Sequence, residues 1–174
     1  MSPRVRNVLN FILFQAGWLF CVLYPGRPAA FGAMALVALH LAVISRHRLA
    51  EAQFIGLGVV AGASLDTLWL NTGVLSAPTG ALGVAPPWLV GLWAMFMTTV
   101  CHSLSWMDDR RWLPFLLAPI AGPFAYWSAA ELGAVNLDRG ALSLAALALG
   151  WLVLFPLLLW VRRTLYTELC HDPA

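Results

Sequence analysis

The sequence predicts an all-α membrane protein, and three observations lead to that fold class. Hydrophobic residues make up 61% of the 174-residue chain and charged residues only 10%, against roughly one quarter charged in soluble domains. Six apolar segments each approach the ~20 residues that a membrane-spanning helix needs. Arginines gather on one side of these segments, as in polytopic membrane proteins. We expect a single helical-bundle domain over residues 1–174.

The six predicted spans are separated by short loops that contain Pro, Gly and Ser. Pro25-Gly26 follows the first span, Ser76-Ala77-Pro78 follows the third, and Pro86-Pro87 precedes the fourth. No gap between spans is long enough to hold a soluble domain. The predicted spans are Asn7–Tyr24, Pro28–Ser45, Gln53–Leu75, Trp88–Trp106, Leu113–Leu132 and Leu142–Val161.

The arginines orient the predicted spans. Lys and Arg are enriched on the cytoplasmic side of membrane proteins, so the side with more arginines is predicted to be cytoplasmic, and both termini lie there. A cleaved signal peptide is the alternative for the first span, but five further spans follow it. The predicted cytoplasmic arginines are Arg4, Arg6, Arg46, Arg48, Arg110, Arg111, Arg162 and Arg163, against Arg27 and Arg139 on the other side.

The third span carries the most informative pattern. At 100° per residue, Glu51, Gly58, Gly62 and Asp66 fall on one stripe of the helix. Gly58 and Gly62 form a GxxxG pair, which predicts close packing against another helix. An acid within a span costs roughly 2.5–3.5 kcal/mol on insertion scales, so Asp66 is expected to face the bundle interior.

Polar residues near the cytoplasmic side form the first candidate site. His40, Glu51 and His102 are predicted at one depth, as candidate catalytic residues together with Asp66. Two imidazoles and a carboxylate could bind Zn or Fe, or a Glu–His pair could move protons. A structural polar network is the third interpretation. No HxxH, HxxxH or HExxH motif is present, so the metal and any cofactor stay unassigned.

The second candidate site lies deeper, around Asp66. Its carboxyl group could accept protons or anchor a substrate, or it could only hydrogen-bond to Tyr126, Gln15 or a backbone carbonyl. Tryptophans at positions 18, 69, 93 and 127 could line a pocket for an acyl or isoprenoid chain. The predicted substrate-binding residues are Gln15, Asn71, Trp93 and Tyr126.

Short motifs along nearly the whole chain resemble a family of small bacterial inner-membrane proteins, a domain-of-unknown-function group. The resemblance implies an inner-membrane location and company with genes for unsaturated or cyclopropane-type fatty-acyl modification, and it assigns no catalytic residue. The motifs are Asn10-Phe11, Phe14-Gln15-Ala16-Gly17-Trp18, Gly62 to Asp66, Asn71-Thr72-Gly73, Trp88, Leu92-Trp93, His102-Ser103-Leu104 and Gly122-Pro123-Phe124-Ala125-Tyr126.

The leading functional hypothesis is binding, presenting or modifying a membrane lipid or acyl chain. One alternative is a small proton-coupled transporter that uses Asp66, although no internal repeat supports it. The other is a non-catalytic assembly partner of a membrane protein or of a second copy of the chain. The net charge of +2 gives no indication of a nucleic-acid partner. Whether the protein is an enzyme stays open.

Overall fold

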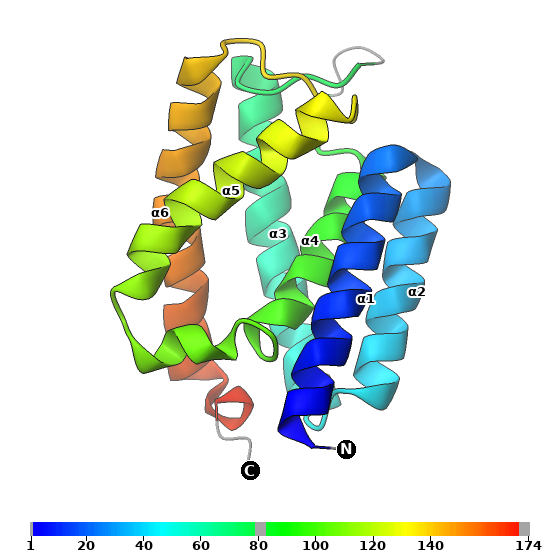
Figure 1. Ribbon diagram of the computed structural model, residues 1–174, viewed down its shortest axis with the longest axis vertical. Helices are drawn as coiled ribbons and strands as arrows, with labels where there is room; N and C mark the ends of the chain where they lie inside the picture. Colours follow the sequence, from blue (N-terminus) through cyan, green and yellow to red (C-terminus); the bar gives the residue numbers. More distant parts are fainter. Residues whose placement is uncertain (1, 79–82, 171–174) are drawn as a thin grey trace.

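The computed structural model describes residues 2–78 and 83–170, and all regular elements in this part of the chain are helical (Figure 1). The predicted all-α class is therefore confirmed. The elements are α1 (Pro3–Leu23), α2 (Arg27–Val43), α3 (Arg48–Thr72), α4 (Pro87–Val100), α5 (Leu113–Glu131) and α6 (Ala141–Leu165), with two short 3₁₀ helices, η1 (Ser105–Asp109) and η2 (Thr167–Leu169).

Four of the six α-helices, α1, α3, α5 and α6, are long and apolar enough to cross a membrane. The other two are apolar but shorter, with 17 residues in α2 and 14 in α4. At a rise of 1.5 Å per residue they extend about 26 Å and about 21 Å, less than the ~30 Å hydrocarbon core of a bilayer. The helix lengths and composition are those of a membrane protein.

Local sequence signals set most of the helix ends. Ser2 caps α1 by accepting a hydrogen bond from the Val5 amide, and Pro3 occupies the first turn, where no amide partner is needed. Gly73 ends α3 in the left-handed conformation, with φ of 69°. The predicted fourth span is wrong at its end, because α4 stops at Val100, and a turn followed by the start of η1 replaces the α-helix predicted as far as Trp106.

Side chains just before the end of α4 donate hydrogen bonds to backbone carbonyls of the last turn. The Thr98 hydroxyl donates to the Met95 carbonyl at 2.7 Å, and the Thr99 hydroxyl donates to the Phe96 carbonyl at 2.6 Å. The buried Arg162 guanidinium of α6 donates to the Val100 carbonyl. Such bonds give carbonyls at a helix end partners outside the helical pattern, so the chain can leave the helix here. His102 consequently lies in a turn.

The short helix α4 is central in the bundle: ten of its 14 residues are buried. It packs against α1, α2 and α3, while α5 and α6 pair with each other and α6 contacts α3 (Figure 1). α1 begins and α6 ends at the same end of the bundle, which also carries the turns after α2 and α4 (Figure 1). We call this the arginine-rich end, after the eight arginines that flank these termini and turns.

Two glycines of α3 lie at a close contact with a neighbouring helix. A Cβ atom added to Gly58 would lie 2.1 Å from Met97 Sδ, and one added to Gly62 would lie 2.1 Å from Trp93 Cδ2. Both neighbours belong to α4, so the GxxxG pair faces another helix, as its spacing predicts. By contrast, the side chain of Val60, between the two glycines, is 68% exposed.

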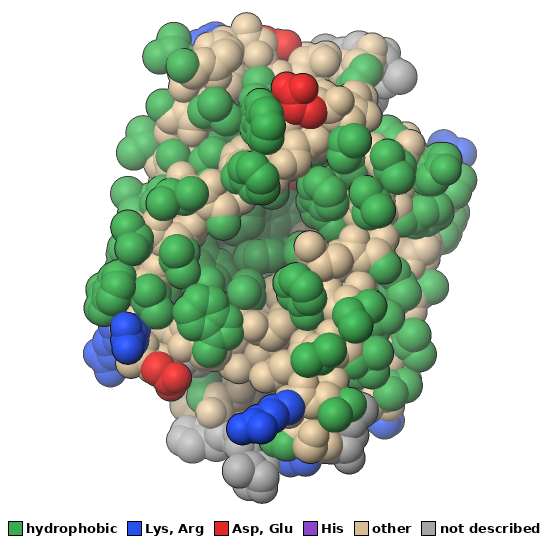
Figure 2. Space-filling model, in the orientation of Figure 1, with side chains coloured by type: hydrophobic (Ala, Val, Ile, Leu, Met, Phe, Trp, Pro, Cys, Tyr) green, Lys and Arg blue, Asp and Glu red, His purple; other side chains and the backbone are tan. Residues whose placement is uncertain are grey.

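Large apolar side chains cover much of the face drawn in Figure 2, and exposed large apolar residues are present on α1, α2, α3, α5 and α6. On a soluble protein such an apolar exterior would drive aggregation, whereas lipid tails solvate it. The face that carries α1 and α5 is also hollowed between these two helices, and apolar side chains line the hollow (Figure 2). This hollow is the mouth of a cavity inside the bundle.

Candidate functional site

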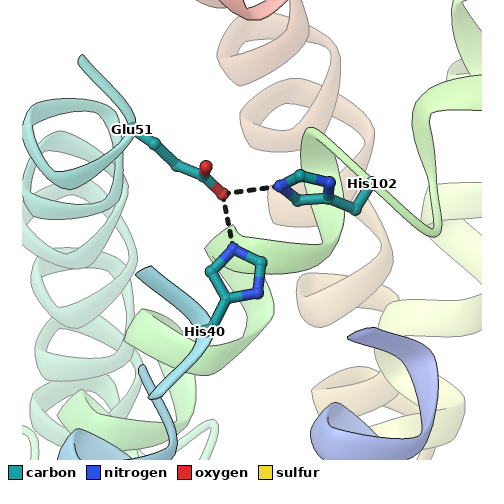
Figure 3. A group of neighbouring side chains, drawn as sticks. All are labelled: His40, Glu51 and His102. Atoms are coloured by element: carbon teal, nitrogen blue, oxygen red, sulfur yellow. Dashed lines mark hydrogen bonds and ion pairs between the residues drawn. The ribbon is translucent and has the colours of Figure 1, made fainter. Parts of the chain in front are cut away.

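Three titratable side chains meet near the arginine-rich end of the bundle (Figure 3). His40 comes from α2, Glu51 from the first turn of α3, and His102 from the turn after α4. Glu51 Oε1 lies 2.7 Å from His40 Nε2 and 3.0 Å from His102 Nε2. The two imidazole rings meet edge to face, with 4.8 Å between their centroids. We call these three residues the Glu51 cluster.

The Glu51 cluster is almost sealed from solvent, with 2%, 2% and 7% of His40, Glu51 and His102 exposed. A cavity of about 30 Å³ reaches Glu51 and His102 and has His40 outside its lining. This volume is enough for one water molecule. Its other lining residues are Arg6, Arg46, His47, Cys101, Glu168 and Leu169.

Asn10 of α1 fixes how His40 is held. Its Oδ1 accepts from the Ser103 amide at 3.3 Å and from the Ser103 hydroxyl at 2.7 Å. Its Nδ2 donates to the Thr98 hydroxyl at 3.0 Å and to the Thr98 carbonyl at 3.3 Å, and it also lies 3.3 Å from His40 Nδ1. Because an amide nitrogen only donates, His40 Nδ1 accepts, and the proton of the neutral ring sits on Nε2 facing Glu51.

The chemistry of the Glu51 cluster follows from its three donor atoms, which all lie within 4.8 Å of one another. Two imidazole nitrogens and a carboxylate oxygen are a ligand set that transition metals use. Without an ion, the carboxylate and the two rings form a hydrogen-bonded acid–base group. The sequence prediction placed these three residues at one depth, and the structure brings them together.

Asp66 forms a separate site in the same helix. It lies 15 residues after Glu51, or about 22 Å along the helix axis at 1.5 Å per residue. Trp93 Nε1 of α4 donates to Asp66 Oδ2 at 2.6 Å, and Tyr126 Oη of α5 donates to Oδ1 at 2.5 Å. Asp66 itself is 0% exposed. The four predicted catalytic residues therefore occupy two places, and Asp66 ties three helices together.

A cavity of about 520 Å³ lies between α1, α4, α5 and α6 and opens at the hollow of Figure 2. We call it the apolar pocket. Trp93 and Tyr126 form part of its wall, with Asp66 behind them. Its lining residues are mostly apolar; the main ones are Phe11, Phe14, Gln15, Trp18, Trp88, Leu92, Trp93, Phe96, Thr99, Ser103, Ala121, Ala125, Tyr126, Trp151 and Phe155.

Three of the four predicted substrate-binding residues, Gln15, Trp93 and Tyr126, line this pocket. The fourth, Asn71, lies outside its lining and hydrogen-bonds to the Thr67 and Gly83 carbonyls, so it anchors the loop after α3. Among the tryptophans that the sequence indicated, Trp18 and Trp93 line the pocket, while those at positions 69 and 127 lie outside its lining.

Some site residues gave no sequence signal of their role. The Trp151 ring of α6 stacks on Trp93, with 5.2 Å between the centroids and 13° between the planes. Phe96 contacts both rings edge to face. Asn10 and Ser103, which join the Glu51 cluster to the pocket wall, entered the sequence analysis only as members of the short motifs Asn10-Phe11 and His102-Ser103-Leu104. Contacts between helices depend on their relative rotation, which periodicity within one helix leaves open.

The chain matches a family described as "Protein of unknown function (DUF2878)" over residues 7–157, so it belongs to this family. The expected membership of an uncharacterised family is confirmed. No match is found among the curated proteins or among the solved structures.

Proposed function

We propose that this DUF2878 family member is a lipid-binding protein that holds an acyl chain of a membrane lipid in the apolar pocket. One observation carries the proposal: the pocket of about 520 Å³ opens sideways, between α1 and α5, on the apolar face of the bundle. The volume lies within the roughly 300–1,000 Å³ typical of ligand sites. A ligand that enters from this side comes from the lipid phase.

The surroundings of the mouth support a ligand from the membrane. Phe11 on α1 and Phe124 on α5 line the pocket and are 52% and 62% exposed. The pocket walls inside are dominated by aromatic rings and aliphatic chains, which contact an acyl chain without desolvation cost. Of the few polar residues in the wall, Thr99 and Ser103 lie toward the arginine-rich end, whereas Gln15 lies farther along α1 and Ser128 near the opposite end of α5. A lipid whose head group sits at that end could place its chain in the pocket.

The proposed setting is the inner membrane of a bacterium, with six spans and both termini in the cytoplasm. The eight arginines at the arginine-rich end support this orientation, because cytoplasmic loops carry most Lys and Arg. α2 and α4 would span as short helices packed against the longer ones. A lipid head group at the arginine-rich end would then belong to the cytoplasmic leaflet.

Asp66 fits this proposal as a positioning residue. It has no exposed surface, so it reaches a bound chain only through Trp93 and Tyr126. A proton-coupled transporter would instead need a titrating group that a solute or water can approach. In the lipid-binding proposal, Asp66 therefore holds the Trp93 and Tyr126 side chains in place in the pocket wall.

Photocrosslinking tests the proposal at the central helix. Vesicles of phospholipids with a diazirine on one acyl chain would be used to reconstitute the protein, and labelled peptides mapped by mass spectrometry. Leu92 and Phe96 of α4 line the pocket, whereas bulk lipid contacts the outer helix surfaces. We expect labelling of α4 near these residues. Labels confined to the outer surfaces would overturn the proposal.

A matched pair of substitutions gives the control. Ala121 lies in the pocket lining, and Ala38 is exposed on α2 away from it. Ala121→Trp should fill the pocket and remove the α4 labels, while Ala38→Trp should leave them unchanged. Equal labelling of α4 in both variants would show that the label reaches α4 by a route other than the pocket.

A further inference from the structure

We infer that the Glu51 cluster is a binding site for a divalent first-row transition-metal ion. His40, Glu51 and His102 present their ligand atoms to one point, from three different elements of the bundle (Figure 3). Metal–ligand bonds of about 2.0–2.2 Å place tetrahedral ligand atoms roughly 3.3 Å apart. The separations of 2.7 Å and 3.0 Å from Glu51 Oε1 need to widen by about 0.6 Å and about 0.3 Å, and the two histidine ligand nitrogens, which lie within 4.8 Å of each other, need to reach the same separation.

The ligand types select the class of ion. Two imidazole nitrogens and one carboxylate oxygen suit Zn²⁺, Fe²⁺, Co²⁺ or Mn²⁺, whereas Ca²⁺ and Mg²⁺ prefer oxygen ligands. Three protein ligands leave a fourth position open, as in catalytic zinc sites. The cavity of about 30 Å³ reaches Glu51 and His102, so the open position can hold a water molecule.

Asn10 lets the hydrogen bonds around His40 adapt to the ion. A metal on His40 Nε2 moves the ring proton to Nδ1, which then needs an acceptor, as metal-bound histidines usually have. A half-turn of the Asn10 amide brings Oδ1 to His40 Nδ1 and leaves Nδ2 to donate to the Ser103 hydroxyl. The contacts given up are those with the Thr98 carbonyl and the Ser103 amide, both 3.3 Å long, and the donation to the Thr98 hydroxyl at 3.0 Å.

Metal titration of the full-length protein in detergent tests the site. Chelator-treated protein would be titrated with Co²⁺ alone, whose visible absorption reports its ligands, and then with Zn²⁺ in competition. We expect one ion per chain and a spectrum of nitrogen and oxygen ligands. A sulfur charge-transfer band would place the ion on a cysteine outside the cluster and overturn the assignment, as would absence of stoichiometric binding to the wild type.

Substitutions locate the ion, with His47 as the matched control. His47 lines the same small cavity but is exposed and lies outside the cluster. His102→Ala and Glu51→Gln should each weaken Co²⁺ binding by more than the 10–100-fold typical of outer ligand partners, and His47→Ala should not. Equal affinities in all three variants would overturn the proposal.

A gain of affinity tests the site without removing a ligand, in case those variants fold poorly. Asn10→Asp supplies an acceptor for His40 Nδ1–H in place of the amide, and it should raise Co²⁺ affinity by about 10–100-fold. Asn71→Asp adds the same charge at the far end of α3 and should leave affinity unchanged. An unchanged affinity in the Asn10 variant would contradict metal binding through His40 Nε2.

Discussion

Helix α3 carries two buried acids, Glu51 and Asp66, and their surroundings differ in kind. Glu51 accepts from two imidazoles, and the hydrogen bonds that the structure gives it both end on Oε1. Asp66 accepts from an indole on one oxygen and a phenol on the other. Imidazoles change protonation near neutral pH, whereas an indole does not titrate and a phenol does so only near pH 10.

Access separates the two acids as well. A small cavity, lined mostly by charged and polar residues, reaches Glu51 near the arginine-rich end, whereas Asp66 lies behind the wall of the apolar pocket. The partners of Glu51 are therefore groups that can bind a metal ion or transfer a proton, and the cavity beside it can admit an ion or a water molecule. A catalytic or metal site needs both features. Asp66 has fixed partners on two other helices, which suits a structural tie. A buried acid in a span is thus a functional candidate only once its partners and its access are known.

The largest effect should come from removing the Asp66 acceptor. Asp66→Leu leaves Trp93 Nε1–H and Tyr126 Oη–H without their shared acceptor, and each buried unsatisfied group costs about 1–3 kcal/mol. We expect a loss of about 2–6 kcal/mol of folding free energy, seen as a strongly lowered thermal unfolding midpoint in detergent. A variant as stable as the wild type would show that Asp66 does not hold the helices together.

Isosteric amides compare the two acids directly. In Asp66→Asn the amide oxygen can accept from Trp93 and the NH₂ group can donate to Tyr126 Oη, but the Tyr126 O–H then has lost its own acceptor. In Glu51→Gln the remaining oxygen can still accept from both histidines. We expect the Asp66 variant to lose about 1–3 kcal/mol and the Glu51 variant much less, measured by thermal unfolding without added metal. The reverse order would contradict the assignment of the tie to Asp66.

Much of the fold could be predicted because composition and Pro/Gly positions mark apolar helices. The end of α4 could not, since it depends on side-chain bonds from Thr98 and Thr99 and on Arg162 from a distant helix. An apolar run such as Trp88–Val100 predicts a helix, but it does not indicate whether the helix stops at the end of the run or continues for another turn.

The sequence predicted the depth of the candidate site residues in the membrane, but not which side chains contact one another. Topology placed His40, Glu51 and His102 at one level, and Tyr126 was an expected partner of Asp66. Trp93 was expected to line a pocket, but its hydrogen bond to Asp66 was not expected. Whether the indole N–H of Trp93 reaches Asp66 depends on the rotation of α4 relative to α3, which the sequence leaves open. Asn71 shows the opposite error, a polar residue at depth that anchors a loop.

A smaller effect separates hydrogen bonding from packing at the Asp66 site. Trp93 and Trp151 stack on each other and line the same pocket, but only the Trp93 indole donates to Asp66; Trp151 Nε1 has no hydrogen-bond partner among the described residues. Trp93→Phe should therefore cost about 1–2 kcal/mol more than Trp151→Phe in thermal unfolding. Equal costs would mean that ring packing, and not the bond to Asp66, matters here.

The smallest effect should come from removing the hydrogen bond between Ser103 and Asn10, which lies next to the Glu51 cluster. Ser103→Ala removes one hydroxyl donor to Asn10 Oδ1, a neutral hydrogen bond of about 0.5–1.5 kcal/mol. The Ser103 amide and the Thr98 carbonyl still orient the Asn10 amide, so Nδ2 keeps facing His40 Nδ1. ¹⁵N NMR of the histidines in metal-free protein should accordingly show His40 protonated on Nε2 in both the wild type and the variant. A shift of the proton to Nδ1 in the variant alone would make the Ser103 hydroxyl the group that sets the tautomer. A proton on Nδ1 in the wild type would mean that the metal-free cluster already has the arrangement assigned to the metal-bound one.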